Sequence, residues 1–254
     1  MLGISGISKH FGGLLALDDI SFSVEPLEIK ALIGPNGAGK TTLLNIVSGV
    51  YPPDKGTVAL SGVEISGLAP SKIARRGVSR TFQHVDLFGA MTVLENIMVG
   101  RHLKTRAGFL ASGLTLPFVR REEREIRKKS EEILEYIGLA HRAEELAANL
   151  PIGEERVLEI GRALATEPKL LLLDEPASGL NEAETIALTR FIKRLRDERG
   201  ITIMLVEHDM GLVMNLSERI VVLDFGEKIA EGTPSEIRGN KLVIDAYLGV
   251  EDIA

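Results

Sequence analysis

The sequence predicts an α/β fold built on a mostly parallel sheet, and three observations support this class. Strand-sized apolar runs without polar alternation indicate strands buried on both faces: Leu170–Leu173, Ile201–Val206 and Ile220–Leu223. Helical patterns separate these runs, as a parallel sheet requires. The 26 glycines lie mostly between the periodic segments, where they suit turns.

The first part of the chain alternates strands and helices. Ile20–Val24 reads as a half-buried strand, and Leu27–Ile33 as a strand that becomes more apolar toward its end. The remaining expectations are a helix at Lys40–Val50, a hairpin of Thr57–Leu60 with Val63–Ile65, a helix at Pro70–Arg76 and a strand at Val78–Phe82.

The middle of the chain predicts a helical insertion. Thr92 and Glu95 form a capping-box pattern at the start of a helix. Thr105–Val119 reads as a loop, and Arg120–Glu135 as a solvated helix with balanced charges. Later helices are expected at Glu154–Thr166, Asn181–Arg199 and Asp209–Leu216, the second capped by Asn181 with Glu184.

Composition excludes several classes of function. The chain has 254 residues, no cysteine and a formal charge of −6, so disulfide scaffolds, thiolate metal sites and phosphate-backbone wrapping are not expected. Aromatic residues make up 4%, too few for a nucleic-acid stacking platform. No apolar run is long enough for a membrane span, and no signal peptide is visible at the start.

A phosphate-binding turn follows the strand that ends at Ile33. Residues 34–41 read GPNGAGKT and match the pattern G-x-x-x-x-G-K-[ST] between a strand and a helix. Glycines let backbone N–H groups surround a β-phosphate, and the helix N-terminus adds positive charge. Lys40 can reach the β- and γ-oxygens, and the Thr41 hydroxyl can bind Mg²⁺. The turn therefore predicts binding of a nucleoside triphosphate.

Two carboxylates end the apolar strand Leu170–Leu173. Asp174 and Glu175 are delivered to the carboxyl edge of the sheet, where ligands of such folds bind. Asp174 is expected to hold Mg²⁺, and Glu175 to polarise the attacking water. Together with the phosphate turn, this strand predicts an ATPase or a phosphotransferase.

Further motifs in the expected order resemble the nucleotide-binding subunits of ABC transporters over nearly the whole chain. These motifs are residues 81–83 (TFQ), 149–156 (NLPIGEER) and 206–209 (VEHD). Within this family, the sequence looks most like the ATPases of branched-chain amino-acid importers. The features that carry this narrower resemblance are residues 80–83 (RTFQ), the long helical insertion, and the segments 231–234 (EGTP) and 246–249 (AYLG) near the end of the chain.

The resemblance implies a RecA-like P-loop NTPase core with an N-terminal antiparallel β subdomain and an inserted all-helical subdomain. The chain is then one ABC ATPase domain. Its parts are a β subdomain with the first part of the core (1–84), the helical subdomain (85–153), the second part of the core (154–239) and a C-terminal tail (240–254).

The resemblance also implies site roles. Glu175, His208, Lys40 and Gln83 are the catalytic candidates, and Thr41, Gln83 and Asp174 the metal ligands. Phe11 stacks on adenine, and Ala177–Asn181 matches the loop that crosses a dimer interface. The expected nucleotide-binding residues are Phe11, Gly34, Pro35, Asn36, Gly37, Ala38, Gly39, Lys40, Thr41, Thr42, Leu150, Gly153 and Glu154.

The sequence departs from the family pattern at three positions, one of which is Ile152, where a glycine or an aromatic residue is common. Pro151 replaces the usual serine and offers neither a hydroxyl nor an N–H to a γ-phosphate. Losing one hydrogen bond to a charged group costs about 1.5–3 kcal/mol, so hydrolysis is expected to survive. Asn181 stands where aspartate is frequent, which is a milder change.

The implied partners are membrane permease subunits, a second ATPase subunit and a solute-binding protein, with ATP and Mg²⁺ as cofactors and the cytoplasmic face of the membrane as location. Nucleic acid is not expected. Three alternatives remain open: a soluble ABC-type ATPase acting on DNA or ribosomes, import of another small polar solute, and a kinase that uses the same phosphate turn.

Overall fold

The computed structural model describes residues 1–81, 87–101 and 117–248, and of 117–120 it describes the backbone alone. The chain forms two compact units. The first contains Met1–Arg80 together with the chain from Lys169 onward, and the second contains Thr81–Pro168. The helical unit is therefore inserted into the sequence of the first, between two strands of its sheet.

A six-stranded sheet forms the centre of the first unit, with the order β10-β9-β3-β8-β7-β6. β9, β3, β8, β7 and β6 run parallel, and β10 pairs antiparallel with β9. Every residue of β3, β7 and β8 is buried, as the apolar runs predict. The strands are β3 (Ile29–Ile33), β6 (Val78–Arg80), β7 (Leu170–Asp174), β8 (Thr202–Val206), β9 (Arg219–Asp224) and β10 (Glu227–Gly232).

A four-stranded antiparallel sheet with the order β2-β1-β4-β5 completes the β structure of this unit. It confirms the expected β subdomain and the β4–β5 hairpin. Strand β1 is not predicted from the sequence, since Gly6, which has a φ of 63°, interrupts the alternation of apolar and polar residues; its pairing with β2 also contains register shifts. The strands are β1 (Leu2–Phe11), β2 (Leu14–Val24), β4 (Lys55–Leu60) and β5 (Val63–Glu64).

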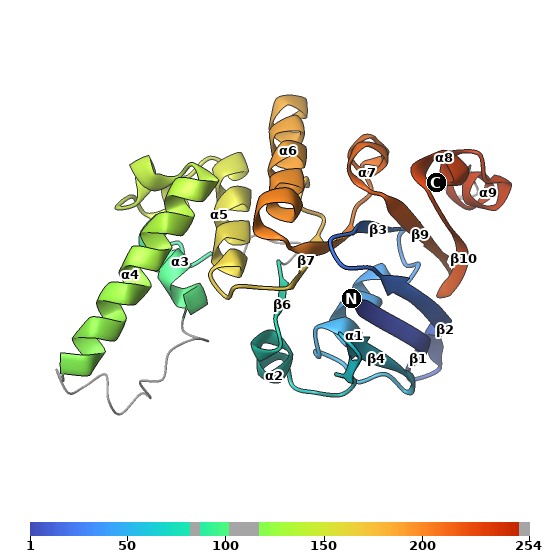
Figure 1. The fold of residues 1–254 in the computed structure, drawn as a ribbon. Coiled ribbons are helices and arrows are strands. Elements are labelled where there is room, and N and C mark those ends of the chain that lie inside the picture. Colours follow the sequence, from blue (N-terminus) through green and yellow to red (C-terminus); the bar gives the residue numbers. More distant parts are fainter. Residues whose placement is uncertain (82–86, 102–116, 249–254) are drawn as a thin grey trace. The chain divides into compact units, whose positions relative to one another are not determined.

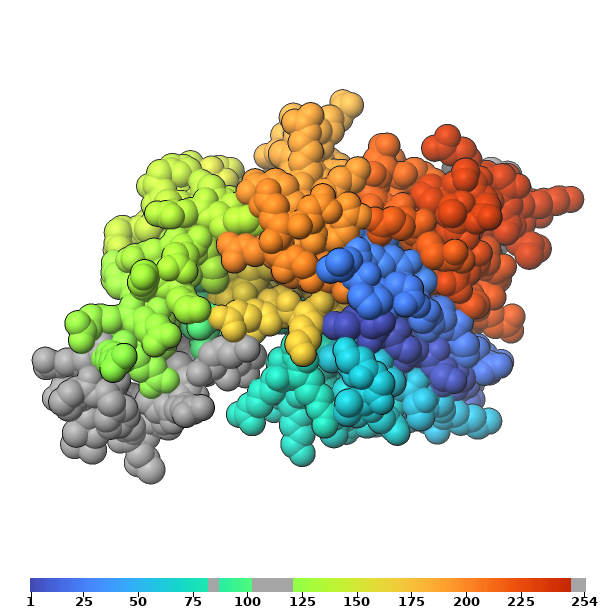
Figure 2. Space-filling model, viewed as in Figure 1, coloured from blue at the N-terminus to red at the C-terminus, as the bar shows by residue number. Residues whose placement is uncertain are grey.

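Six helices are described in the first unit, and two of them begin with a side-chain cap that lies close to the candidate site in sequence. Asn181 caps α6 with a complete capping box, and Asp209 caps α7, as the sequence predicts. Figure 2 shows the blue N-terminal strands side by side with the orange and red chain that follows Lys169. The helices are α1 (Lys40–Val47), α2 (Pro70–Arg75), α6 (Glu182–Arg199), α7 (Met210–Leu216), α8 (Pro234–Arg238) and α9 (Lys241–Leu248).

One apolar core joins the two sheets of the first unit to α1. Leu43, Leu44 and Val47 of α1 are fully buried in it, together with Leu170 and Leu172 of β7. Because α1 begins at the phosphate turn, this packing fixes the helix that carries Lys40 against the strand that carries Asp174.

The regular elements described in the second unit are helices (Figure 1). Thr92 and Glu95 make the predicted capping box before α3. A Cβ at Gly161 would lie 2.6 Å from Ile137 Cδ1, so glycine lets α4 and α5 pack closely. The elements are α3 (Val93–Arg101), α4 (Pro117–Ile137), η2 (Ala140–Arg142), η3 (Ala147–Asn149) and α5 (Ile152–Leu164).

Some element bounds differ from the expected ones. Helix α4 begins at Pro117, so the last residues of the expected loop Thr105–Val119 are helical; proline suits a first turn because its missing N–H needs no partner there. The rest of that loop lies outside the described residues. Helix α5 packs on α3 and α4 and so belongs to the second unit. In the described ranges, no helix has both the length and the apolar character of a membrane span.

Candidate nucleotide-binding and hydrolysis site

The phosphate turn lies between the buried end of β3 and the start of α1. Gly34, Gly37 and Gly39 have φ values of 150°, 82° and 99°, which residues with a Cβ rarely adopt. A Cβ on Gly34 would lie 2.0 Å from the carbonyl oxygen of Leu223, and one on Gly39 would lie 2.6 Å from Leu17 Cδ2. Backbone conformation and close packing therefore both require glycine at these two positions.

The side chain of Lys40 forms hydrogen bonds with the backbone of the phosphate turn. Its Nζ donates to the carbonyl oxygens of Gly34 at 2.7 Å and Pro35 at 2.9 Å. Burial lowers the pKa of Lys40, while the negative charges of Glu175 and Asp174 act in the opposite direction. The ammonium group thus lies within the field of both carboxylates, and bound phosphate oxygens would replace the two carbonyls as its partners. Thr41, the next residue, is exposed.

Asp174 is buried at the end of β7, and Arg80 holds its carboxylate. Arg80 Nη2 lies 2.8 Å from Asp174 Oδ2, and both side chains are almost fully buried. The same guanidinium donates from Nη1 to Asn45 Oδ1 at 2.7 Å and to Ser48 Oγ at 3.1 Å. Arg80 therefore joins the last turn of α1 and β6 to the carboxylate at the end of β7.

Glu175 lies just beyond β7 in an unusual backbone conformation. Its φ is 47°, a region that non-glycine residues seldom occupy, and its N–H donates to Val206 O at 2.9 Å. Glu175 Oε2 lies 3.8 Å from Nδ1 of His208, whose side chain is 64% exposed. The structure thus brings together Glu175 and His208, two of the predicted catalytic residues.

A second buried carboxylate lies behind this pair. Glu207 is 1% exposed, and its oxygens accept from the backbone N–H groups of Ala177 at 2.8 Å, His208 at 3.0 Å and Asp209 at 3.4 Å. Burial raises the pKa of Glu207, and these hydrogen bonds oppose the rise. Glu207 belongs to the motif 206–209 (VEHD), but nothing in the sequence signals its contact with Ala177.

Phe11 is the last residue of β1 and is 41% exposed. Its ring makes an edge-to-face contact with Tyr51, with centroids 5.3 Å apart, and Lys9 Nζ lies 5.6 Å from its centroid. An exposed aromatic face suits stacking on a planar base. Sequence reasoning did not single out Tyr51, which follows α1 in sequence.

The residues of the NLPIGEER segment lie in the second unit, at the start of α5. Pro151 is the N-cap residue and makes no side-chain cap, while its carbonyl accepts from Glu154 and Glu155. Leu150 is buried and Gly153 is half-buried. Glu154 pairs with Arg142, whose Nε lies 2.9 Å from Glu154 Oε2. The helix start therefore presents backbone, without a capping hydroxyl.

The oxygen donors at the turn fit a magnesium ion. Mg²⁺ retains water and phosphate oxygens and takes only one or two ligands from the protein, so a ready-made cluster is not needed. In the described part of the chain, no group of three or more His, Cys, Asp or Glu side chains is arranged to hold a metal ion by itself. The hydroxyl of Thr41 and the carboxylate of Asp174 are hard oxygen ligands on elements that the core packs together. Gln83 lies outside the described residues.

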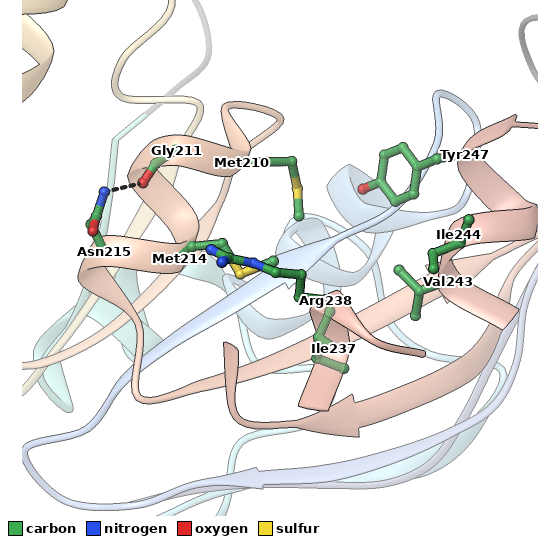
Figure 3. Close-up of a pocket in the computed structure, with 9 residues that line it drawn as sticks. All are labelled: Met210, Gly211, Met214, Asn215, Ile237, Arg238, Val243, Ile244 and Tyr247. Carbon is green, nitrogen blue, oxygen red and sulfur yellow. Dashed lines mark hydrogen bonds between the residues drawn. The ribbon is translucent and has the colours of Figure 1, made fainter. Parts of the chain in front are cut away.

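An apolar pocket of about 490 Å³ lies between α7 and the C-terminal helices. Figure 3 shows the hydroxyl of Tyr247 pointing toward Met210, the first residue of α7. Burial raises the pKa of Tyr247, and the backbone N–H of Gly34 opposes the rise. The hydroxyl of Tyr247 is buried and makes no hydrogen bond with the described residues.

The sheet, the glycine turn with Lys40 and the carboxylates at the strand ends define a P-loop nucleoside triphosphatase. Residues 17–178 match the family model described as "ABC transporter", and residues 227–253 match one described as "Branched-chain amino acid ATP-binding cassette transporter".

Two curated relatives are the high-affinity branched-chain amino acid transport ATP-binding proteins BraF of Pseudomonas aeruginosa and LivG of Escherichia coli. Each is 47% identical over 98% of both chains. A solved ATP-binding cassette of an ABC transporter in its ADP conformation has a TM-score of 0.86 and 32% identity, covering 98% of both chains.

A dimeric ATP-binding cassette bound to ADP and Pi has a TM-score of 0.77 and 26% identity, covering 92% of this chain and 99% of that one. The chain belongs to the ABC transporter family and, within it, to the branched-chain amino acid transport ATP-binding proteins. It is an ATPase, and ATP is its nucleotide.

Proposed function

We propose that this chain hydrolyses ATP to drive the import of branched-chain amino acids through membrane permease subunits. The observation that carries the proposal is the glycine turn with its buried Lys40, whose Nζ donates to the carbonyl oxygens of Gly34 and Pro35 and so lies where phosphate oxygens would bind. The names of the relatives support the transported class.

In the proposed reaction the chain positions the nucleotide and stabilises developing charge. Lys40 and the backbone N–H groups of the turn hold the β- and γ-phosphates. Glu175 accepts the proton of the attacking water, and His208 contacts the γ-phosphate from the neighbouring loop. Gln83 reports the state of that phosphate to the permease.

The nucleotide contacts extend beyond the phosphates. Phe11 stacks on the adenine, and Pro35, Asn36, Ala38 and Thr42 complete the wall of the phosphate turn. When bound, Mg²⁺ neutralises charge on the β- and γ-phosphates, with Thr41, Asp174 and Gln83 as its protein ligands.

A second ATPase subunit completes the proposed site. Its Leu150, Gly153 and Glu154, at the start of α5, face the γ-phosphate, where the helix N-terminus favours negative charge. The dimeric relative bound to ADP and Pi supports this arrangement. The permease subunits and a solute-binding protein belong to the same system, and the chain acts at the cytoplasmic face of the membrane.

The proposal is tested by ATP binding and phosphate release with the purified full-length chain. Lys40→Ala should lose most of its affinity for Mg-ATP, because the buried ammonium no longer meets the phosphates. Glu175→Gln should keep that affinity and lose at least about a hundredfold in hydrolysis, since the general base is removed.

Glu64→Gln, which changes an exposed carboxylate on β5, serves as the matched control and should hydrolyse ATP like the parent chain. Undiminished hydrolysis in Lys40→Ala would contradict the proposal, and transfer of phosphate to a small molecule would indicate a kinase. ATP-driven leucine uptake into vesicles that contain the assembled transporter tests the transported class, and tight nucleic-acid binding would point to the soluble alternative.

A further inference from the structure

The side chain of Glu207 is completely shielded from solvent, and its two oxygens serve different loops. Oε1 accepts from the N–H of Ala177, 30 residues away in sequence, and Oε2 accepts from the N–H of His208. A carboxylate is costly to bury, and hydrogen bonds to backbone N–H groups offset that cost. The site therefore retains a charged group where an apolar side chain would pack at a lower cost.

The first loop held by Glu207 carries Glu175. This loop is fastened to the end of β8 at two points, by the bond from Glu175 N–H to Val206 O and by the bond from Ala177 N–H to Glu207. The positive φ of Glu175 is a strained conformation that persists only when its surroundings hold it. Glu207 supplies one of the contacts that hold it.

The second loop held by Glu207 carries His208. Oε2 accepts from His208 N–H and, at 3.4 Å, from Asp209 N–H, and Asp209 in turn caps α7 by accepting from Leu212. His208 Nδ1 lies 3.9 Å from Glu207 Oε2, similar to its 3.8 Å from Glu175 Oε2. One carboxylate therefore fixes the backbone of His208 relative to that of Glu175.

We propose that Glu207 is a positioning residue that holds the loops of Glu175 and His208 in register, so that the general base and the γ-phosphate contact act together. This inference rests on the proposed function. Only a group with two acceptor oxygens and no donor satisfies both loops at once. Glutamine offers one such oxygen, and its NH₂ group would face an N–H of one loop.

The test compares Glu207→Gln with the parent chain in steady-state ATP hydrolysis. The kcat should fall by at least about tenfold because one loop is released, and misplacement of catalytic groups by about 1 Å has effects of this size or larger. The KM for ATP should stay within about twofold, because Lys40 and the phosphate turn are untouched. Rates are normalised to the ATP-binding stoichiometry, so that unfolded protein does not count.

Glu28→Gln is the matched control. Glu28 is also buried, and its carboxylate accepts a hydrogen bond from the backbone N–H of Glu25. It directly precedes the first residue of β3, whereas the phosphate turn follows the last residue of that strand. The kcat of the Glu28→Gln variant should equal that of the parent chain. Equal kcat losses in Glu28→Gln and Glu207→Gln would overturn the inference, because both effects would then be structural.

A double-mutant cycle with His208→Ala separates positioning from a general loss of stability. If Glu207 acts through His208, Glu207→Gln should lower kcat far less in the His208→Ala background than in the parent chain. Full additivity would overturn the inference. If Glu207→Gln does not fold, Glu207→Asp replaces it, because it keeps both oxygens but shortens the reach. An unchanged kcat in that variant would overturn the inference, whereas a parent chain without ATPase activity would refute the proposed function instead.

Discussion

Charged side chains are used differently at the carboxyl edge of the six-stranded sheet and on helix α4. At the sheet edge, Arg80 and Asp174 pair while both are almost fully buried. On α4, Arg127 and Glu131 pair at 3.0 Å, yet each side chain remains about half exposed. Buried pairs are costly to break and exposed pairs contribute little, so the same kind of substitution should have very different effects in the two regions.

The largest effect is expected at Arg80. Arg80→Met should lower the free energy of unfolding by about 3–5 kcal/mol, because Asp174 then loses a buried positive partner. Denaturant unfolding measures the loss. The double variant Arg80→Met with Asp174→Asn should recover most of the stability, and no recovery would show that Arg80 acts through Asn45 and Ser48 instead.

The capping boxes of α6 and α3 allow a direct comparison of the units. Asn181→Ala in the first unit and Thr92→Ala in the second should each cost about 1 kcal/mol, because each leaves one helix N–H without its side-chain acceptor. Thermal unfolding of the two variants measures both losses. A loss confined to one of them would show that the units do not unfold together.

A smaller effect that depends on pH is expected at Asp54. Hydrogen bonds from Lys9 Nζ and from the backbone N–H of His10 lower the pKa of its carboxyl group to about 2. Because this pKa is lower in the folded chain than in the unfolded chain, the ionised carboxylate stabilises the fold at pH values above its ordinary pKa. That stabilisation is lost as the pH falls toward 2. Asp54→Asn should therefore be slightly less stable than the parent at pH 6. The difference should vanish near pH 2, and denaturant unfolding at both values checks this.

The smallest effect is expected on the surface of α4. Arg127→Ala should change the free energy of unfolding by roughly 0.5 kcal/mol or less, since an exposed pair gains little in water and is screened by salt. Unfolding at low and high salt measures it. A loss as large as that of Arg80→Met would remove the contrast between the two regions.

Local features of the fold follow from the sequence, and pairing between distant segments does not. The glycine turn, the buried runs and the capping boxes of α3 and α6 are set by neighbouring residues, so the sequence predicts them. Strand β1 is not predicted, because Gly6 interrupts its alternation of apolar and polar residues. The pairing of Arg80 with Asp174, 94 residues apart, depends on which strands become neighbours, and no spacing rule encodes that.

The candidate site divides in the same way. Lys40, Asp174 and Glu175 are recognisable because phosphate binding needs those residue types in those local patterns. Phe11 and His208 enter only through the family resemblance, because an isolated aromatic or histidine carries no signal of its own. The role of Glu207 becomes visible only in three dimensions, where its carboxylate accepts hydrogen bonds from two loops.

Arg80 is the last residue of the first unit, and the chain passes directly from it into the helical unit. The same residue grips the carboxylate of Asp174 and the final turn of α1. Any displacement of the chain at this boundary would therefore act directly on the contacts of Arg80 with Asp174 and Asn45. The covalent connection between the two units and the ion pair that holds the Asp174 carboxylate therefore meet at one residue.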